Sequence, residues 1–171
     1  GKNIRVLDRD YVEVVKPFFK NAKNRNVALL IYGDALSATT HIEILQSAKK
    51  KKIKVEITHS SSILTAVAET GLSLYKFGKT ASIPFWQEHF KPESFFDIYS
   101  DNQKIQAHTL FLLDLKPELD SFMNVKQAIE TLLIVAKKKK SKLFTEKTFC
   151  IGCSQLGTDK QIIKFGTAKQ L

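Results

Sequence analysis

Two short polar segments each follow an apolar, strand-like run and carry groups that could bind a ligand. In residues 33–40, Gly33 allows close backbone approach, Asp34 can accept hydrogen bonds from an amine or a ribose hydroxyl, and Ser and Thr hydroxyls follow. In residues 59–62, backbone amides before an expected helix could hold a carboxylate or an adenine edge. Plainer interpretations remain open, with Asp34 in an Asx-turn and Ser62 as a helix N-cap.

Other catalytic patterns find little support in the sequence. The 33–40 segment lacks the lysine and glycine spacings of common phosphate-binding loops. The four histidines show no metal-binding spacing with glutamate or cysteine, so we expect no metal site. No Ser-His-Asp arrangement with a nucleophile elbow is visible, and the catalytic residue stays unassigned.

A CxxC pair, Cys150 and Cys153, raises the question of zinc or redox chemistry. The sequence has no second such pair, and strand residues three apart point to opposite faces. We therefore expect structural cysteines. The low cysteine content, with no secretory leader in the sequence, favours a reducing compartment, and we expect a cytoplasmic protein.

The first half of the chain alternates predicted strands and helices. Apolar runs at 4–7 and 27–32 and the alternating pattern of 53–58 indicate strands, and the 27–32 run is continuous enough for burial on both faces of a parallel sheet. Helical spacing indicates helices over 11–22, after a Thr40–Glu43 capping box, and from Ser62 to near Gly71. This order predicts an α/β fold with a parallel sheet.

The second half is richer in aromatic residues. We expect strands at 81–85 and 109–115, a helix at 92–99, a helix opening at Asn124, and a final strand pair at 147–152 and 161–165. This change in amino-acid composition predicts a domain boundary near residues 80–84, which gives domains 1–82 and 83–171. The aromatic residues of 85–99 could cover an interface or form the core of the second domain.

Composition narrows the class of protein. The 171 residues include 43% hydrophobic side chains, which excludes a disordered, collagenous or coiled-coil chain. No apolar run approaches the roughly 18 residues of a membrane span. The net charge is +10, yet only Arg5, Arg9 and Arg25 among the 27 basic residues are arginine, the residue preferred for base and phosphate recognition. We expect a solvated basic surface and no specific nucleic-acid binding, with attraction to an acidic macromolecule left open.

Taken together, several motifs closely resemble the diphthine synthase family, particularly its eukaryotic form. The resemblance extends in order and spacing over nearly the whole chain. It is carried by Gly33-Asp34 with Ala38-Thr-Thr-His41, His59-Ser-Ser-Ser-Ile63, Gly71-Leu72, Leu74-Tyr-Lys-Phe-Gly78, Phe85-Trp86, Pro92-Glu-Ser-Phe-Phe-Asp97, and His108-Thr-Leu with Leu113-Asp114.

The resemblance implies a two-domain tetrapyrrole methylase-like fold, with a parallel sheet in the first domain and a mixed sheet in the second. It also implies S-adenosylmethionine as cofactor, with S-adenosylhomocysteine as product, bound in the cleft between the domains. Because the family's first strand with its Gly-x-Gly loop and its last strands are not recognised here, we expect the chain to lack the family's N- and C-terminal segments. The positions that match the family's cofactor contacts are Asp34, Ser37, Ser62, Ile63, Leu113 and Leu156.

The resemblance further implies a homodimer that methylates the modified histidine of translation elongation factor 2 during diphthamide biosynthesis. Eukaryotic members add a methyl ester as well as the trimethylamino group. Two alternatives remain: a small-molecule methylase acting on a tetrapyrrole, and a non-catalytic cofactor-binding or scaffold protein.

Overall fold

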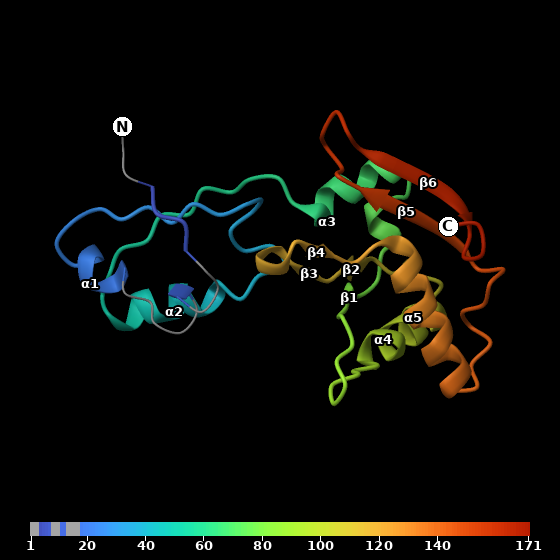
Figure 1. Cartoon of the computed structure of the whole chain (residues 1–171). Coiled ribbons are helices and arrows are strands. Elements are labelled where there is room, and N and C mark those ends of the chain that lie inside the picture. The colour runs from blue at the N-terminus through green and yellow to red at the C-terminus, as the bar shows by residue number, and fades with distance from the viewer. Residues whose placement is uncertain (1–3, 8–10, 13–17) are drawn as a thin grey trace. The chain divides into compact units, whose positions relative to one another are not determined.

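The computed structural model describes residues 4–7, 11–12 and 18–171 of the chain (Figure 1). These residues form two compact units, Gly1–Thr65 and Ala66–Leu171, called here the first and the second unit. The domain boundary predicted after residue 82 remains a prediction. The α/β class is confirmed, because helices occur together with parallel and antiparallel strand pairs.

The first unit contains helix α1 (Phe18–Ala22) and helix α2 (Ile42–Lys50), and helix α3 (Ile63–Ala66) begins at its end. Helix α2 ends with Lys49 and Lys50, whose charges complement the C-terminal dipole of the helix. The N-cap residue of α2 is His41, one position after the predicted capping residue Thr40. Residues 13–17 of the predicted first helix lie outside the described residues.

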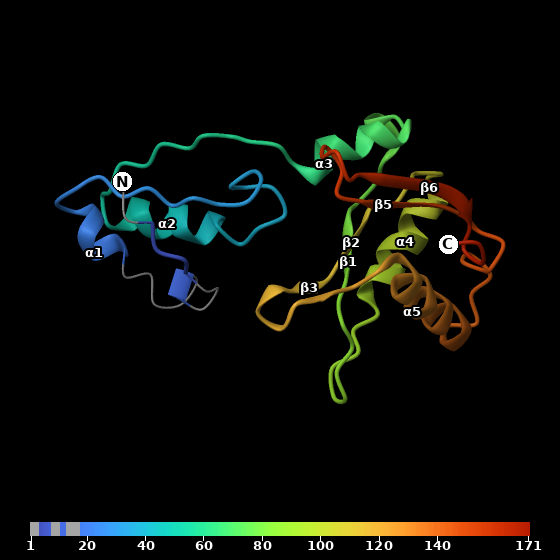
Figure 2. The same ribbon diagram turned by 45° about the horizontal axis from the view of Figure 1, so that its top comes forward.

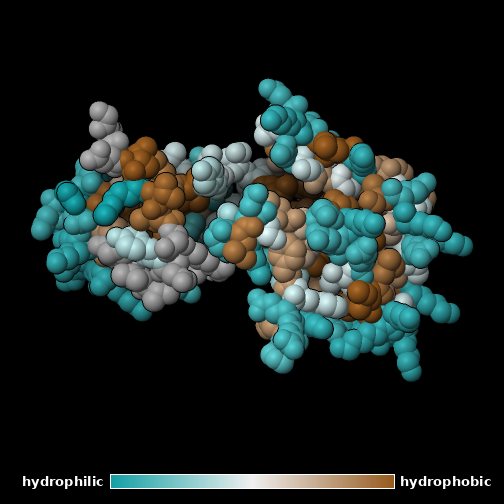
Figure 3. All heavy atoms as spheres, in the orientation of Figure 1, coloured by the Kyte–Doolittle hydropathy of each residue, from teal (hydrophilic) through white to brown (hydrophobic). Residues whose placement is uncertain are grey.

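The parallel sheet predicted for this part of the chain is not formed among the described residues. The segments 4–7, 27–32 and 53–58 belong to no strand, and the strands begin only at Ala81. Apolar sequence favours a strand, but a strand also needs a neighbour that satisfies its backbone hydrogen bonds. Leu30 is 71% exposed and Val55 is 45% exposed, so these runs lack a covering partner here. A patch of apolar atoms is accordingly visible on the face of the first unit drawn in Figure 3.

The second unit is built on three two-stranded sheets among the described residues. Strand β1 (Ala81–Ile83) pairs in parallel with β2 (Phe111–Leu113), with Ser82 opposite Leu112. Strands β3 (Leu115–Lys116) and β4 (Ser121–Phe122) pair antiparallel, as do β5 (Phe149–Ser154) and β6 (Ile162–Thr167). The strands predicted in this half are therefore confirmed, although the expected mixed sheet is divided into separate pairs.

Two helices complete the core of the second unit. Helix α4 (Ser94–Lys104) packs against β1 and against helix α5 (Val125–Lys138), as Figures 1 and 2 show. Helix α5 begins at the predicted residue because Asn124 accepts from the backbone N–H of Gln127, whose side chain accepts from the Asn124 N–H. The core residues are Ala81, Ile83, Phe95, Phe96, Tyr99, Met123, Ala128, Ile129, Leu132, Val135, Ala136, Phe144 and Ala168.

Short 3₁₀ turns connect these elements at Val67–Thr70, Leu74–Lys76 and Pro117–Leu119. The first of them ends at Gly71, whose φ of 83° is in the left-handed region that glycine adopts without strain. The predicted end of the third helical segment near Gly71 is therefore confirmed.

The aromatic stretch 85–99 is used mainly inside the second unit. Phe95, Phe96 and Tyr99 are buried, and Trp86 packs against them while its indole N–H donates to the carbonyl of Pro92 at 3.1 Å. Phe90 is the exception, at 59% exposed. The core interpretation of these rings is thus the correct one, and they give little support to an interface. In the described part of the chain, no helix is long and apolar enough to cross a membrane.

Candidate functional site

The carboxylate of Asp34 is the centre of the polar site in the first unit. Its side chain is only 7% exposed. One oxygen, Oδ1, accepts from the backbone N–H of Leu36 at 2.9 Å and from the hydroxyl of Ser37 at 3.1 Å. The other, Oδ2, accepts from Nδ1 of His59 at 2.8 Å and from the backbone N–H of Ser60 at 3.2 Å. The carboxylate therefore joins two segments that are about 25 residues apart in sequence.

These contacts fix the charge of Asp34. The Leu36 N–H, the His59 imidazole and the Ser60 N–H lower the pKa of the Asp34 carboxyl well below its usual value of 3.8, against a smaller opposing effect of burial. Asp34 is consequently ionised at every physiological pH. The Leu36 contact is the Asx-turn that the sequence allowed, so the local interpretation of Asp34 is confirmed.

The two segments approach closely because Gly33 carries no side chain. Its φ is 75°, and a Cβ placed there would lie 3.3 Å from the carbonyl oxygen of Ser61. A larger residue would be strained and would press against the 59–62 segment. Gly33 therefore allows the sequence-predicted residues Asp34 and Ser37 to lie beside His59 and Ser60.

Ser62 and Ile63 follow directly on this segment. The hydroxyl of Ser62 accepts from the backbone N–H of Leu64 at 3.2 Å, and its carbonyl accepts from Thr65 N–H at 3.0 Å. The N-cap interpretation of Ser62 is confirmed by these contacts. Ile63 is 38% exposed at the first position of α3. A cofactor role for either residue stays a prediction.

Leu113 and Leu156 lie in the second unit. Leu113 is the last residue of β2, and it packs partly buried against the core. Leu156 is half-buried in the turn between β5 and β6. The adjacent Asp114 has a structural role, because its side chain accepts from the backbone N–H of Phe85 at 2.9 Å. The cofactor contacts assigned to Leu113 and Leu156 by resemblance also stay predictions.

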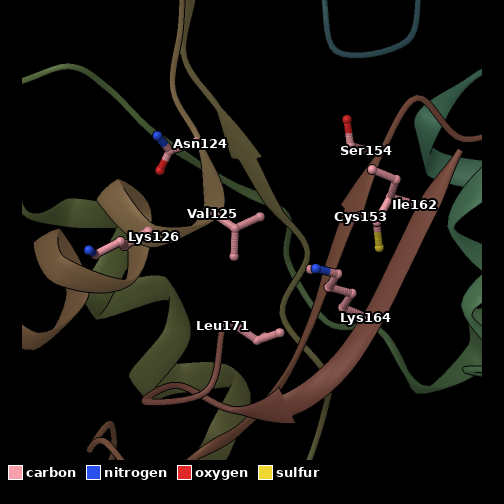
Figure 4. Close-up of a pocket in the computed structure, with 9 residues that line it drawn as sticks. Asn124, Val125, Lys126, Cys153, Ser154, Ile162, Lys164 and Leu171 are labelled. Atoms are coloured by element: carbon pink, nitrogen blue, oxygen red, sulfur yellow. The ribbon is translucent and has the colours of Figure 1, made fainter. Parts of the chain in front are cut away.

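A pocket of about 330 Å³ lies elsewhere in the second unit, between the start of α5 and the β5–β6 hairpin. Figure 4 shows Val125 and Leu171 on one side, and Ile162 and Lys164 on the hairpin opposite. Cys153 lines this pocket, whereas Cys150 packs against the core. Both thiols are free, and burial raises the pKa of each. Raised thiol pKa values oppose nucleophilic reactivity and agree with structural cysteines.

Among the residues that the structure describes, no group of three or more His, Cys, Asp or Glu side chains could hold a metal ion. The contact missed at the sequence level is the one between Asp34 and His59. No local pattern signals this contact, because the two residues are 25 positions apart and the segments that precede them form no strands among the described residues.

Comparison with known proteins agrees with the resemblance recognised in the sequence. The Tetrapyrrole (Corrin/Porphyrin) Methylases family matches residues 2–171. The diphthine methyl ester synthase of Saccharomyces cerevisiae is 37% identical, in a match covering 100% of this chain and 62% of the yeast protein. The diphthine synthase of Methanococcus maripaludis is also 37% identical, with 99% of this chain and 67% of that protein covered.

A solved structure gives the same result. A crystal structure of diphthine synthase superimposes with a TM-score of 0.83 at 30% identity, covering 96% of this chain and 61% of that one. The chain therefore spans about three fifths to two thirds of the length of these relatives. Because the family match extends over nearly every residue, this chain belongs to the tetrapyrrole (corrin/porphyrin) methylase family.

Proposed function

We propose that the whole protein is an S-adenosylmethionine-dependent methyltransferase of the diphthine synthase type, and that it methylates the modified histidine of translation elongation factor 2. The observation that carries this proposal is the 37% identity to proteins named diphthine methyl ester synthase and diphthine synthase over essentially the entire chain. The site around Asp34 supports it, because the matched family motifs at 33–41 and 59–63 come together there in the first unit.

The polar and apolar side chains at the predicted cofactor positions fit a nucleoside cofactor with an amino acid tail. The hydroxyl of Ser37 donates to Asp34 and keeps its lone pairs for a ligand donor. Ser62 and Ile63 offer a polar and an apolar side chain, and Leu113 and Leu156 offer partly buried apolar surface of the kind that adenine contacts. These residues, with Asp34 shaping the loop, are the ones that would hold the cofactor.

When bound, S-adenosylmethionine supplies an activated methyl group on a sulfonium. The contribution of this chain is then mainly orientation, and well-aligned reactants can gain about 7–11 kcal/mol of the barrier from it. Asp34 fixes the 33–37 loop through the Leu36 N–H and the Ser37 hydroxyl, so the binding surface is organised before the ligand arrives.

We propose the binding partner, the oligomeric state and the cellular location of the protein from the same resemblance. The +10 charge would assist encounter with an acidic protein surface in a salt-dependent way. A homodimer and a cytoplasmic location are proposed on the same ground. Light scattering of the whole protein at micromolar concentration tests the dimer, and a monomer would contradict it.

A small-molecule methylase is the second candidate, because the matching family is described by its corrin and porphyrin substrates. A non-catalytic cofactor-binding or scaffold protein is the third.

One assay separates the three candidate functions. Radiolabelled methyl groups from S-adenosylmethionine should appear on elongation factor 2 that carries the aminocarboxypropyl histidine, and not on factor without that modification. Transfer to a porphyrinogen instead would establish the second candidate, and cofactor binding without transfer to either would support the third.

A further inference from the structure

The Asp34–His59 pair has the geometry of a proton-accepting dyad. Nδ1 of His59 lies 2.8 Å from Oδ2 of Asp34, and the carboxylate is ionised at physiological pH. An ionised carboxylate can only accept, so Nδ1 must carry the proton of this hydrogen bond. In the neutral imidazole the other nitrogen, Nε2, is then unprotonated and able to accept a proton.

Burial differs sharply across this pair. The Asp34 side chain is 7% exposed, whereas the His59 side chain is 70% exposed. The carboxylate is thus fixed inside the first unit, and the imidazole projects from it to where a substrate can reach. The same division of roles, with a buried carboxylate orienting a histidine whose other nitrogen moves protons, operates in hydrolase triads.

The ionisable neighbours of His59 are few in the two segments that meet there. The 33–41 loop carries Asp34, which faces the imidazole, and His41, whose Nδ1 lies 2.9 Å from the carbonyl oxygen of Ala35. The 53–61 segment carries Lys54 and Glu56, which pair with each other at 3.2 Å. Asp34 is therefore the charged group that determines the tautomer of His59.

We propose that His59 is the general base of the amine methylation, with Asp34 as the residue that positions it. This inference rests on the proposed function. At neutral pH an amino group beside an ionised carboxylate is almost entirely protonated, and its lone pair is unavailable for attack. Nε2 takes one proton from the substrate ammonium: an N–H bond of the substrate breaks, an Nε2–H bond forms, and the imidazole becomes cationic. The freed lone pair forms the bond to the methyl carbon while the S–CH₃ pair returns to sulfur, which becomes a neutral thioether. The imidazolium then releases its proton to water before the next round.

A carboxylate acceptor needs no such base, because it is already ionised. Formation of a methyl ester on the same substrate is therefore an internal control. Loss of His59 should slow transfer to nitrogen and spare transfer to the carboxylate oxygen, whereas a merely structural change would slow both.

The decisive variant is His59→Asn in the whole protein, because an Asn amide can occupy the place of Nδ1 and keep the bond to Asp34 while removing Nε2. His89→Asn, at an exposed histidine of the second unit, is the matched control and should change neither transfer rate by more than about twofold. Mass spectrometry of modified elongation factor 2 should show N-methylation slowed roughly 100-fold at pH 7 by His59→Asn, with ester formation on the trimethylated substrate within about twofold of wild type. The N-methylation deficit should narrow as the pH rises toward the pKa of the substrate amine, where solvent can take the proton.

Two measurements do not depend on turnover. Calorimetry should give the same affinity for S-adenosylhomocysteine in His59→Asn as in wild type. Nitrogen-15 NMR of the free protein should show the Nδ1–H tautomer of neutral His59, and this preference should weaken in Asp34→Asn. Equal N-methylation by wild type and His59→Asn, or equal loss of N- and O-methylation, would overturn the proposal. No transfer by the wild type would instead refute the proposed function, and the role of His59 with it.

Discussion

Replacing Gly78 with alanine tests whether the buried side chain of Asn102 fastens the parallel strand pair to helix α4. Asn102 is 2% exposed near the end of α4. Its Oδ1 accepts from the backbone N–H of Lys79 at 2.9 Å, and its Nδ2 donates to the carbonyl of Lys79 at 2.8 Å and to Oγ1 of Thr109 at 2.9 Å. A Cβ at Gly78 would overlap Oδ1 of Asn102 and lie 2.6 Å from its Cγ.

The size of the effect follows from these contacts. Three hydrogen bonds at about 1 kcal/mol each, with a small cavity, give a loss of roughly 3–4 kcal/mol for Asn102→Ala. Gly78→Ala must push the amide away from Lys79, so we expect it to cost about 2–3 kcal/mol. In the double variant the new methyl group meets no amide, and the added cost of Gly78→Ala should fall below about 1 kcal/mol.

Urea denaturation measures these free energies of unfolding, with the fluorescence of Trp86 as the probe because it is the one tryptophan of the chain and packs on this core. Gln103→Ala, at an exposed position on the same helix, is the control and should change stability by less than about 0.5 kcal/mol. Additive losses in the double variant, or a Gly78→Ala protein as stable as wild type, would show that Asn102 does not hold the strand pair in this way.

Three further results are expected. Asn124→Ala should lower the free energy of unfolding by about 1 kcal/mol in urea titration, since the N-cap of α5 is lost. Burial, with a smaller contribution from Cys150, raises the pKa of Tyr99 to about 12. The contribution of neutral Tyr99 to the free energy of unfolding is therefore present below pH 10 and is lost as the pH rises through 12. Ultraviolet titration should show a late tyrosinate step that Tyr99→Phe abolishes. The pKa of Asp34 is lowered in the folded protein, so the contribution of its carboxylate to the free energy of unfolding is present above about pH 3.8 and is lost as the pH falls further. In Asp34→Asn, acid unfolding followed by circular dichroism should no longer show this dependence of stability on pH.

The helices and strands of the second unit were largely predictable from sequence, because they supply one another's hydrogen bonds and apolar contacts. The predicted strands at 147–152 and 161–165 become the paired β5 and β6, and the apolar stripe after Asn124 becomes the buried face of α5. The 27–32 run is apolar and 53–58 alternates apolar and polar residues as a strand does, but among the described residues neither segment belongs to a strand. The spacing of apolar residues predicts which face of a strand is buried, but it does not predict which neighbouring strand forms the backbone hydrogen bonds.

The candidate site shows a similar division. The Asx-turn of Asp34 and the N-cap at Ser62 are local contacts between residues close in sequence, and sequence chemistry predicts them. The bond from His59 to Asp34 joins residues on different segments, so it required the structure. Its consequence, a fixed tautomer on an exposed imidazole, could not be inferred from either segment alone.

A crystal structure of the whole protein with S-adenosylhomocysteine bound would show whether the cofactor occupies the site around Asp34. We expect the ligand to lie against the 33–37 loop and the Ser62–Ile63 segment, in contact with Leu113 and Leu156. Its sulfur should be within reach of a substrate amine that faces Nε2 of His59. A ligand bound instead in the pocket between α5 and the β5–β6 hairpin, with the Asp34 loop uncovered, would contradict the assignment of the site.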